Sequence, residues 1–194
     1  KMSDFNKQRA KIQFWQMFIC DAILGNRDRH HGNWGYMVHK GSTSYTPAPL
    51  YDNGASLFPD LNKRINEYTI ALQTNKEYKF IEDRAEKFPA SLFMMERNNG
   101  EIKRTNYYEI LSDLRINKIL AHEVKEIREK VGFNRVYESI FREVSEVKHF
   151  MSYEYRRFYI IIVCVRYLHL IERKSIKDSY IQTIRRLNNE TREY

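Results

Sequence analysis

The stretch that decides the fold reads Gly25-Asn26-Arg27-Asp28-Arg29-His30-His31-Gly32-Asn33, a polar loop between two patterned segments. Upstream, apolar side chains recur at helical spacing with basic residues opposite them, which predicts an amphipathic helix over residues 3–24. Gly25 follows that helix directly, where a glycine favours the left-handed turn that ends many helices. Downstream, residues 34–39 and 44–47 have the pattern of two short strands joined by a turn. The sequence therefore predicts a helix, a polar loop and a small hairpin in that order.

From residue 60 onward the pattern is almost wholly helical. The predicted helices cover residues 61–73, 78–87, 107–111, 116–130, 133–147, 153–172 and 175–187. The segment 153–172 is apolar on all sides, which is typical of the central helix of a bundle. No internal repeat or linker interrupts the sequence. We therefore expect an α+β, mainly α-helical protein that forms a single unit.

The composition narrows the class of protein. The 194 residues are 42% hydrophobic and 30% charged, which excludes a disordered or fibrous chain. The net charge of +8 favours anionic partners, but the basic residues are spread over many predicted helices, so we do not expect nucleic-acid binding. Cys20 and Cys164 lie in apolar runs, which is typical of reduced thiols in a cytoplasmic protein. The most apolar segment, residues 158–171, is shorter than the roughly 20 residues that cross a bilayer, so we expect no membrane partner.

Three side chains with oxygen ligands flank the predicted hairpin. Asp28 and Asn33 lie in the polar loop, and Asp52 follows the hairpin within Ala48-Pro49-Leu50-Tyr51-Asp52-Asn53-Gly54. Oxygen ligands that converge across a hairpin suit Mg²⁺, which binds one or two carboxylates together with phosphates and water. A carboxylate that does not bind the metal can orient a hydroxyl and accept its proton. Phosphoryl transfer requires both functions, and kinases carry an Asp, four residues and an Asn, followed later by Asp-x-Gly.

Two other interpretations of these residues are open. Asp28, His30, His31 and Asp52 have the side-chain types of a transition-metal site, although adjacent histidines in a loop rarely both reach one ion. Asp and Asn also favour loops for backbone reasons alone, which makes turn chemistry the alternative for Asp28 and Asn33. The downstream Asp-x-Gly, in the order and on the elements that phosphoryl transfer requires, favours that reaction over both alternatives.

At this point the two polar segments resemble a known family. Residues 25–33 are similar to the G-N-x-D-R-H-x-x-N catalytic loop of HipA-like serine/threonine kinases, and residues 48–52 are similar to their A-P-x-Y-D metal segment. Trp34-Gly35 and Ser56-Leu57-Phe58-Pro59 resemble the CtkA-type bacterial branch. The match covers about residues 14–59. It implies the C-terminal lobe of a protein kinase, with residues 1–59 as catalytic and metal-binding segment and 60–194 as helical bundle.

The resemblance also implies roles for single residues. Asp28 is then the catalytic base that orients the acceptor hydroxyl. Asn33 and Asp52 are then the ligands of a Mg²⁺ that bridges the ATP phosphates. His30 and Asn26 brace the loop by hydrogen bonding. The implied cofactors are ATP and Mg²⁺, and the implied partner is a protein substrate with a hydroxyl acceptor.

The sequence departs from the kinase pattern upstream of the loop. A kinase also needs a phosphate-binding loop and a Lys on a strand of its N-lobe. Neither stands out here, so we expect the N-lobe to be absent from this chain and the isolated lobe to be inactive. Lys1 leads almost directly into the first helix, from which we expect the start of a larger protein to be missing. An N-lobe partner and, for a toxin, an antitoxin partner are therefore open.

Two other functions are alternatives. A pseudokinase-like regulatory or interaction module can keep the loop as a scaffold, and the missing N-lobe is the argument for it. A phosphatidylinositol-type lipid kinase shares the local D-R-H-x-x-N chemistry, but residues 53–59 offer no basic cluster for an inositol headgroup. Arg27 and Arg29 are not assigned, because either can meet a phosphate or a carboxylate.

Overall fold

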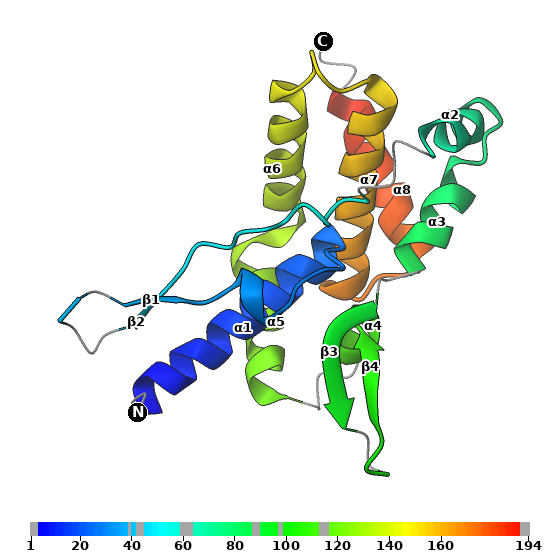
Figure 1. Cartoon of the computed structure of the whole chain (residues 1–194). Coiled ribbons are helices and arrows are strands. Elements are labelled where there is room, and N and C mark those ends of the chain that lie inside the picture. Colours follow the sequence, from blue (N-terminus) through cyan, green and yellow to red (C-terminus); the bar gives the residue numbers. More distant parts are fainter. Residues whose placement is uncertain are drawn as a thin grey trace. The chain divides into compact units, whose positions relative to one another are not determined.

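The structure, a computed structural model, describes residues 4–38, 40–41, 45–58, 64–86, 90–96, 99–112 and 117–190 (Figure 1). The chain divides into two compact units. Unit 1 comprises residues 1–57 and 89–124, and unit 2 comprises residues 58–88 and 125–194. None of the helices in the described part of the chain is long and apolar enough to cross a membrane. The organisation of the chain as a single lobe stays a prediction.

Unit 1 begins with the helix that the sequence predicts. Helix α1 (Asp4–Leu24) turns a buried apolar stripe toward the core of the unit, and its most buried residues are Met17, Phe18, Ile19 and Ala22. The short hairpin of β1 (Tyr36–Val38) and β2 (Tyr45–Pro47) follows, with antiparallel pairing. Between α1 and β1, the 3-10 turn η1 (His31–Asn33) closes the polar loop. The predicted order of helix, loop and hairpin is confirmed.

A second hairpin in unit 1 was not predicted. Strands β3 (Ala90–Glu96) and β4 (Ile102–Asn106) pair antiparallel, with a register shift between Ala90 and Met94. The expectation of an almost wholly helical remainder is therefore wrong over this stretch. A short apolar run such as Leu92-Phe93-Met94-Met95 has no alternation, so its pattern does not distinguish a strand from part of a helix. Helix α4 (Tyr107–Ser112) follows, and α5 (Lys118–Lys130) continues from unit 1 into unit 2.

Unit 2 is a helical bundle. Its further helices are α2 (Ile65–Gln73), α3 (Glu77–Glu86), α6 (Gly132–Glu146), α7 (Tyr153–Leu170) and α8 (Ile176–Glu190). Helix α7 is the centre of this bundle, with α6, α8, α2 and α3 packed against it. It is buried on all sides from residue 160 to residue 168, so its predicted central position is confirmed. The other predicted helices are present within a few residues of their expected bounds, apart from residues 61–63, 87 and 116, which lie outside the described part.

One buried ion pair and its two tyrosine partners join four helices of unit 2, which are α2, α3, α7 and α8. The Glu77 carboxylate accepts hydrogen bonds from Nε and Nη2 of Arg157 at 2.7 and 2.8 Å. It also accepts from the hydroxyls of Tyr68 at 2.5 Å and Tyr180 at 2.7 Å. Burial alone raises the pKa of Glu77, but the hydrogen bonds from Arg157 and the two tyrosines outweigh burial and leave the pKa lowered. Glu77 is thus a satisfied structural charge.

Candidate active site

The polar loop starts from a well-defined helix end. Gly25 has φ +70, and the N–H of Asn26 donates to the carbonyl of Asp21 at 2.9 Å, which is the pattern of a Schellman C-cap. The Asn26 side chain is fully buried. Its Nδ2 donates to Oδ1 of Asp21 at 3.0 Å, and its Oδ1 accepts from the N–H of Asp28 at 3.1 Å. Asn26 therefore ties the end of α1 to the start of the loop.

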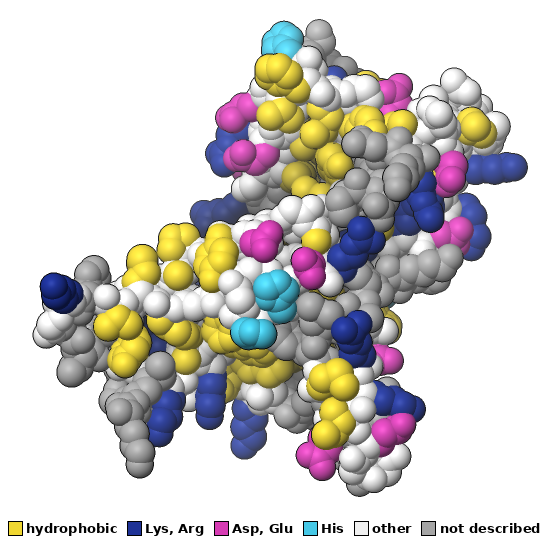
Figure 2. All heavy atoms as spheres, viewed as in Figure 1, with side chains coloured by type: hydrophobic (Ala, Val, Ile, Leu, Met, Phe, Trp, Pro, Cys, Tyr) yellow, Lys and Arg dark blue, Asp and Glu magenta, His cyan; other side chains and the backbone are white. Residues whose placement is uncertain are grey.

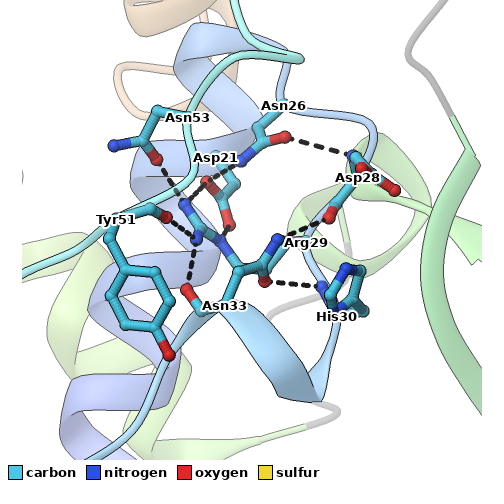
Figure 3. Close-up of polar contacts among 8 residues, drawn as sticks. All are labelled: Asp21, Asn26, Asp28, Arg29, His30, Asn33, Tyr51 and Asn53. Carbon is cyan, nitrogen blue, oxygen red and sulfur yellow. Dashed lines mark hydrogen bonds and ion pairs between the residues drawn. The ribbon is translucent and has the colours of Figure 1, made fainter.

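His30 and Asn33 hold the other end of the loop through its backbone (Figure 3). The N–H of His30 donates to Oδ1 of Asn33 at 2.9 Å, and Nδ2 of Asn33 donates to the carbonyl of Asp28 at 2.8 Å. Nδ1 of His30 accepts a hydrogen bond from the N–H of Gly32 at 3.0 Å, so the His30 ring also braces the loop. Asn33 is only 1% exposed. Its amide fixes the loop, and Oδ1 keeps a second lone pair.

Asp28 is presented at the surface by this arrangement. Its N–H and its carbonyl are both bound by side chains of the loop, those of Asn26 and Asn33. The residue itself is exposed, and Figure 3 shows its side chain extending away from the buried network. A carboxylate on a fixed backbone that stays open to solvent has the setting that a general base requires.

Arg29 is the centre of the network. It is 1% exposed, and its Nε and Nη2 bind the two carboxylate oxygens of Asp21 at 2.8 and 3.0 Å. Its Nη1 donates to the carbonyls of Asn33 and Tyr51, both at 2.8 Å. Its Nη2 donates as well to Oδ1 of Asn53 at 2.6 Å. The hydrogen bond to Asp21 is the main cause that raises the pKa of Arg29, so it stays charged.

Asp52 lies between two residues that Arg29 binds. The carbonyl of Tyr51 and Oδ1 of Asn53, on either side of Asp52, accept hydrogen bonds from the Arg29 guanidinium. Asp52 has φ +55, a left-handed conformation that Asp tolerates better than most residues. It is exposed, as is Asp28. Figure 2 shows that acidic side chains are spread over this face of the molecule and that some of them lie next to histidines. The negative charge of Asp52 also contributes to the raised pKa of Arg29.

Sequence reasoning found part of this site. The structure brings the loop residues Asn26, Asp28, His30 and Asn33 into one hydrogen-bonded turn. The sequence did not indicate roles for Asp21, Tyr51 or Asn53, and it left the role of Arg29 open. One signal for Asp21 was present in the sequence: it lies on the face of α1 that carries Phe18 and Ala22, and a carboxylate there needs a cationic partner. Nothing in the sequence pointed to Arg29 as that partner.

The described residues do not form a transition-metal site. No group of three or more His, Cys, Asp or Glu side chains among them is placed to hold a metal ion. His31 is exposed, and its ring lies 6.0 Å from that of His30. The carboxylate of Asp52 and the amide of Asn33 are a different ligand set, one of hard oxygen atoms that suits Mg²⁺.

Comparisons with known proteins show what the whole chain is similar to. No protein-family model matches the chain. The serine/threonine-protein kinase CtkA of Helicobacter pylori strain J99 is 29% identical over 130 residues, 67% of this chain and 37% of that kinase. The crystal structure of a Helicobacter pylori proinflammatory kinase CtkA matches with a TM-score of 0.63 and 26% identity. The chain is similar to CtkA.

The relationship to CtkA covers more of this chain than of the kinase. The structural match includes 92% of this chain but 57% of the CtkA chain, so the chain spans little more than half of that structure. It confirms the resemblance to CtkA-type kinases and the α+β, mainly helical fold of a kinase C-lobe. The chain is thus similar to a protein kinase over most of its own length.

Proposed function

We propose that this chain is the C-terminal lobe of a serine/threonine protein kinase that transfers the γ-phosphoryl group of ATP to a protein hydroxyl. The observation that carries the proposal is the exposed Asp28 on a fixed loop, joined through Arg29 to the segment that bears Asp52. The relationship to CtkA, a serine/threonine-protein kinase, supports the same reaction class.

Asp28 has the features of the base in this reaction. Phosphoryl transfer needs little covalent help from the protein, and positioning and electrostatics supply most of the rate. Hydrogen bonds at its N–H and carbonyl fix the backbone of Asp28, and its carboxylate is open to an incoming hydroxyl. In the proposed reaction the carboxylate orients the acceptor hydroxyl toward the γ-phosphorus and accepts its proton as the new O–P bond forms. The bond from that phosphorus to the bridging oxygen of ADP breaks in the same transfer, and ADP leaves.

Asn33 and Asp52 have the chemistry to hold Mg²⁺. Both offer oxygen ligands, and Oδ1 of Asn33 has one lone pair left after accepting from His30. The Asp52 side chain is exposed, and its backbone has a left-handed conformation with φ +55. When bound, Mg²⁺ neutralises charge on the ATP phosphates.

The proposed reaction also needs the parts of a kinase that bind the ATP phosphates. The chain spans 37% of the curated CtkA sequence, and the phosphate-binding loop and Lys of a kinase are assigned to a part of the protein outside these residues. Transfer is therefore expected from the longest native form of the protein, with little turnover by residues 1–194 alone.

Labelled γ-phosphate transfer from ATP with Mg²⁺ tests the proposal in the longest native form. Protein acceptors and phosphatidylinositol vesicles are offered in parallel, beside the variant Asp28→Ala. Transfer to protein that is lost in the variant supports the proposal. Transfer to the vesicles alone replaces it with a lipid kinase. No transfer, together with no thermal shift by ATP and Mg²⁺, replaces it with a regulatory module.

A further inference from the structure

The guanidinium of Arg29 uses its whole hydrogen-bonding capacity. Its five N–H donors meet five acceptor atoms on Asp21, Asn33, Tyr51 and Asn53. These acceptors come from three separate stretches: the last turns of α1, the polar loop and the segment after β2. A buried side chain that satisfies three stretches at once fixes their spacing.

One atom of Arg29 binds both the loop and the segment that bears Asp52. Nη1 of Arg29 donates to the carbonyl of Asn33 and to the carbonyl of Tyr51, each at 2.8 Å. Asn33 is one of the two proposed Mg²⁺ ligands, and Tyr51 directly precedes the other. The two ligand-bearing segments therefore meet at this buried nitrogen, in addition to an exposed hydrogen bond from the Tyr51 hydroxyl to the carbonyl of Gly32 at 3.2 Å.

We infer that Arg29 is the positioning residue that holds the Asp52 segment against the loop of Asp28 and Asn33, so that the two metal ligands converge. This inference rests on the proposed function. Arg29 does not touch substrate or metal in this role. It acts through the backbone of Asn33 and through both neighbours of Asp52.

Only an arginine can make these contacts. Lys carries three donors on one nitrogen, without the planar fork that binds a carboxylate with two atoms. In Arg29→Lys the positive charge can stay near Asp21, but one ammonium cannot also reach the carbonyls of Asn33 and Tyr51. The variant therefore separates the ion pair from the link between the segments.

The first measurement is the Mg²⁺ concentration for half-maximal phosphoryl transfer in the longest native form. For Arg29→Lys we expect an increase of about 10- to 100-fold, the range seen when residues that orient metal ligands are changed. The matched control is Arg157→Lys, which breaks the same kind of buried pair with Glu77 in unit 2. It is expected to lower the thermal midpoint and leave the Mg²⁺ requirement unchanged.

The second measurement is amide hydrogen exchange, which does not depend on activity. The N–H of Asn33 donates to the carbonyl of His30, and the N–H of Leu57 donates to the carbonyl of Leu24. These amides report on the loop and on the Asp52 segment. In Arg29→Lys we expect both to lose protection, while amides of α7 keep theirs. In Arg157→Lys both keep their protection.

Each outcome decides something. An unchanged Mg²⁺ requirement or unchanged exchange in a folded Arg29→Lys protein overturns the inference. If that variant does not fold, Asn53→Ala removes one exposed acceptor and must raise the Mg²⁺ requirement in the same direction, by less; no rise overturns the inference. A wild-type protein that transfers no phosphate overturns the proposed function, and exchange alone then decides whether Arg29 joins the segments.

Discussion

The N–H of Gly32 donates to Nδ1 of His30 at 3.0 Å, and the His30 ring leaves little room for a side chain on Gly32. A methyl group on Gly32 would lie 3.0 Å from Cε1 and 3.1 Å from Nδ1 of that ring. Gly32 is therefore small because the His30 ring folds back over it. This contact closes the turn that begins at Asp28 and ends at Asn33.

Gly32→Ala is expected to displace the His30 ring and loosen the loop. Misplacing catalytic groups by about 1 Å costs up to about 100-fold in rate, so we expect transfer to fall by about 10- to 100-fold. Gly35→Ala is the control, because a methyl there meets nothing within 4 Å. Kinetics of both variants check the prediction, and equal activities would show that the His30 contact is irrelevant.

The buried pair of Asp21 and Arg29 is expected to dominate the stability of unit 1. Asp21→Ala leaves a buried guanidinium without its carboxylate, which typically costs about 3–5 kcal/mol. Urea unfolding of wild type and variant measures the difference in the free energy of unfolding. A loss below about 1 kcal/mol would mean that the pair contributes little.

Glu77 is expected to make stability depend on pH in the acid range. Its folded pKa is lowered from the ordinary value of 4.5, so its contribution is fully present above that value and is lost as pH falls through the folded pKa. Thermal midpoints measured from pH 6 to pH 3 should fall more steeply for wild type than for Glu77→Gln. Parallel curves would contradict the assignment.

Tyr107 has a buried hydroxyl with no hydrogen-bond partner among the described residues. Burial raises the pKa of this phenol, and the charge of Asp21 adds to the rise. Because the hydroxyl was taken from water without compensation, Tyr107→Phe is expected to keep or raise stability, by up to about 1–2 kcal/mol. A destabilised variant in urea unfolding would show that the hydroxyl is in fact bound.

The sequence predicted the elements whose pattern is local. The spacing of apolar side chains predicts helices α1 and α7, and Gly25 marks the C-terminal end of α1. The hairpin of β3 and β4 was missed because its first strand is a short apolar run that fits either a strand or a helix.

The site was predicted where its chemistry is local and missed where its contacts are distant. Asp28 and Asn33 lie in one short loop, so their spacing along the chain shows that they belong together. Arg29 binds a carboxylate on the preceding helix and acceptors 22 and 24 residues further on. Both arginines of the loop had the same sequence signal, and burial distinguishes them: Arg29 is buried and Arg27 is exposed. Only the fold shows this difference.

The most direct measurement is γ-phosphoryl transfer by the longest native form of the protein, compared between wild type, Asp28→Ala and Asp83→Ala. Asp28 and its control Asp83 both have solvent-accessible carboxylates, so both variants are expected to stay folded, as thermal midpoints will show. If Asp28 is the base, Asp28→Ala loses transfer and Asp83→Ala keeps it. Full transfer by a folded Asp28→Ala protein would contradict the assignment of Asp28 as the base.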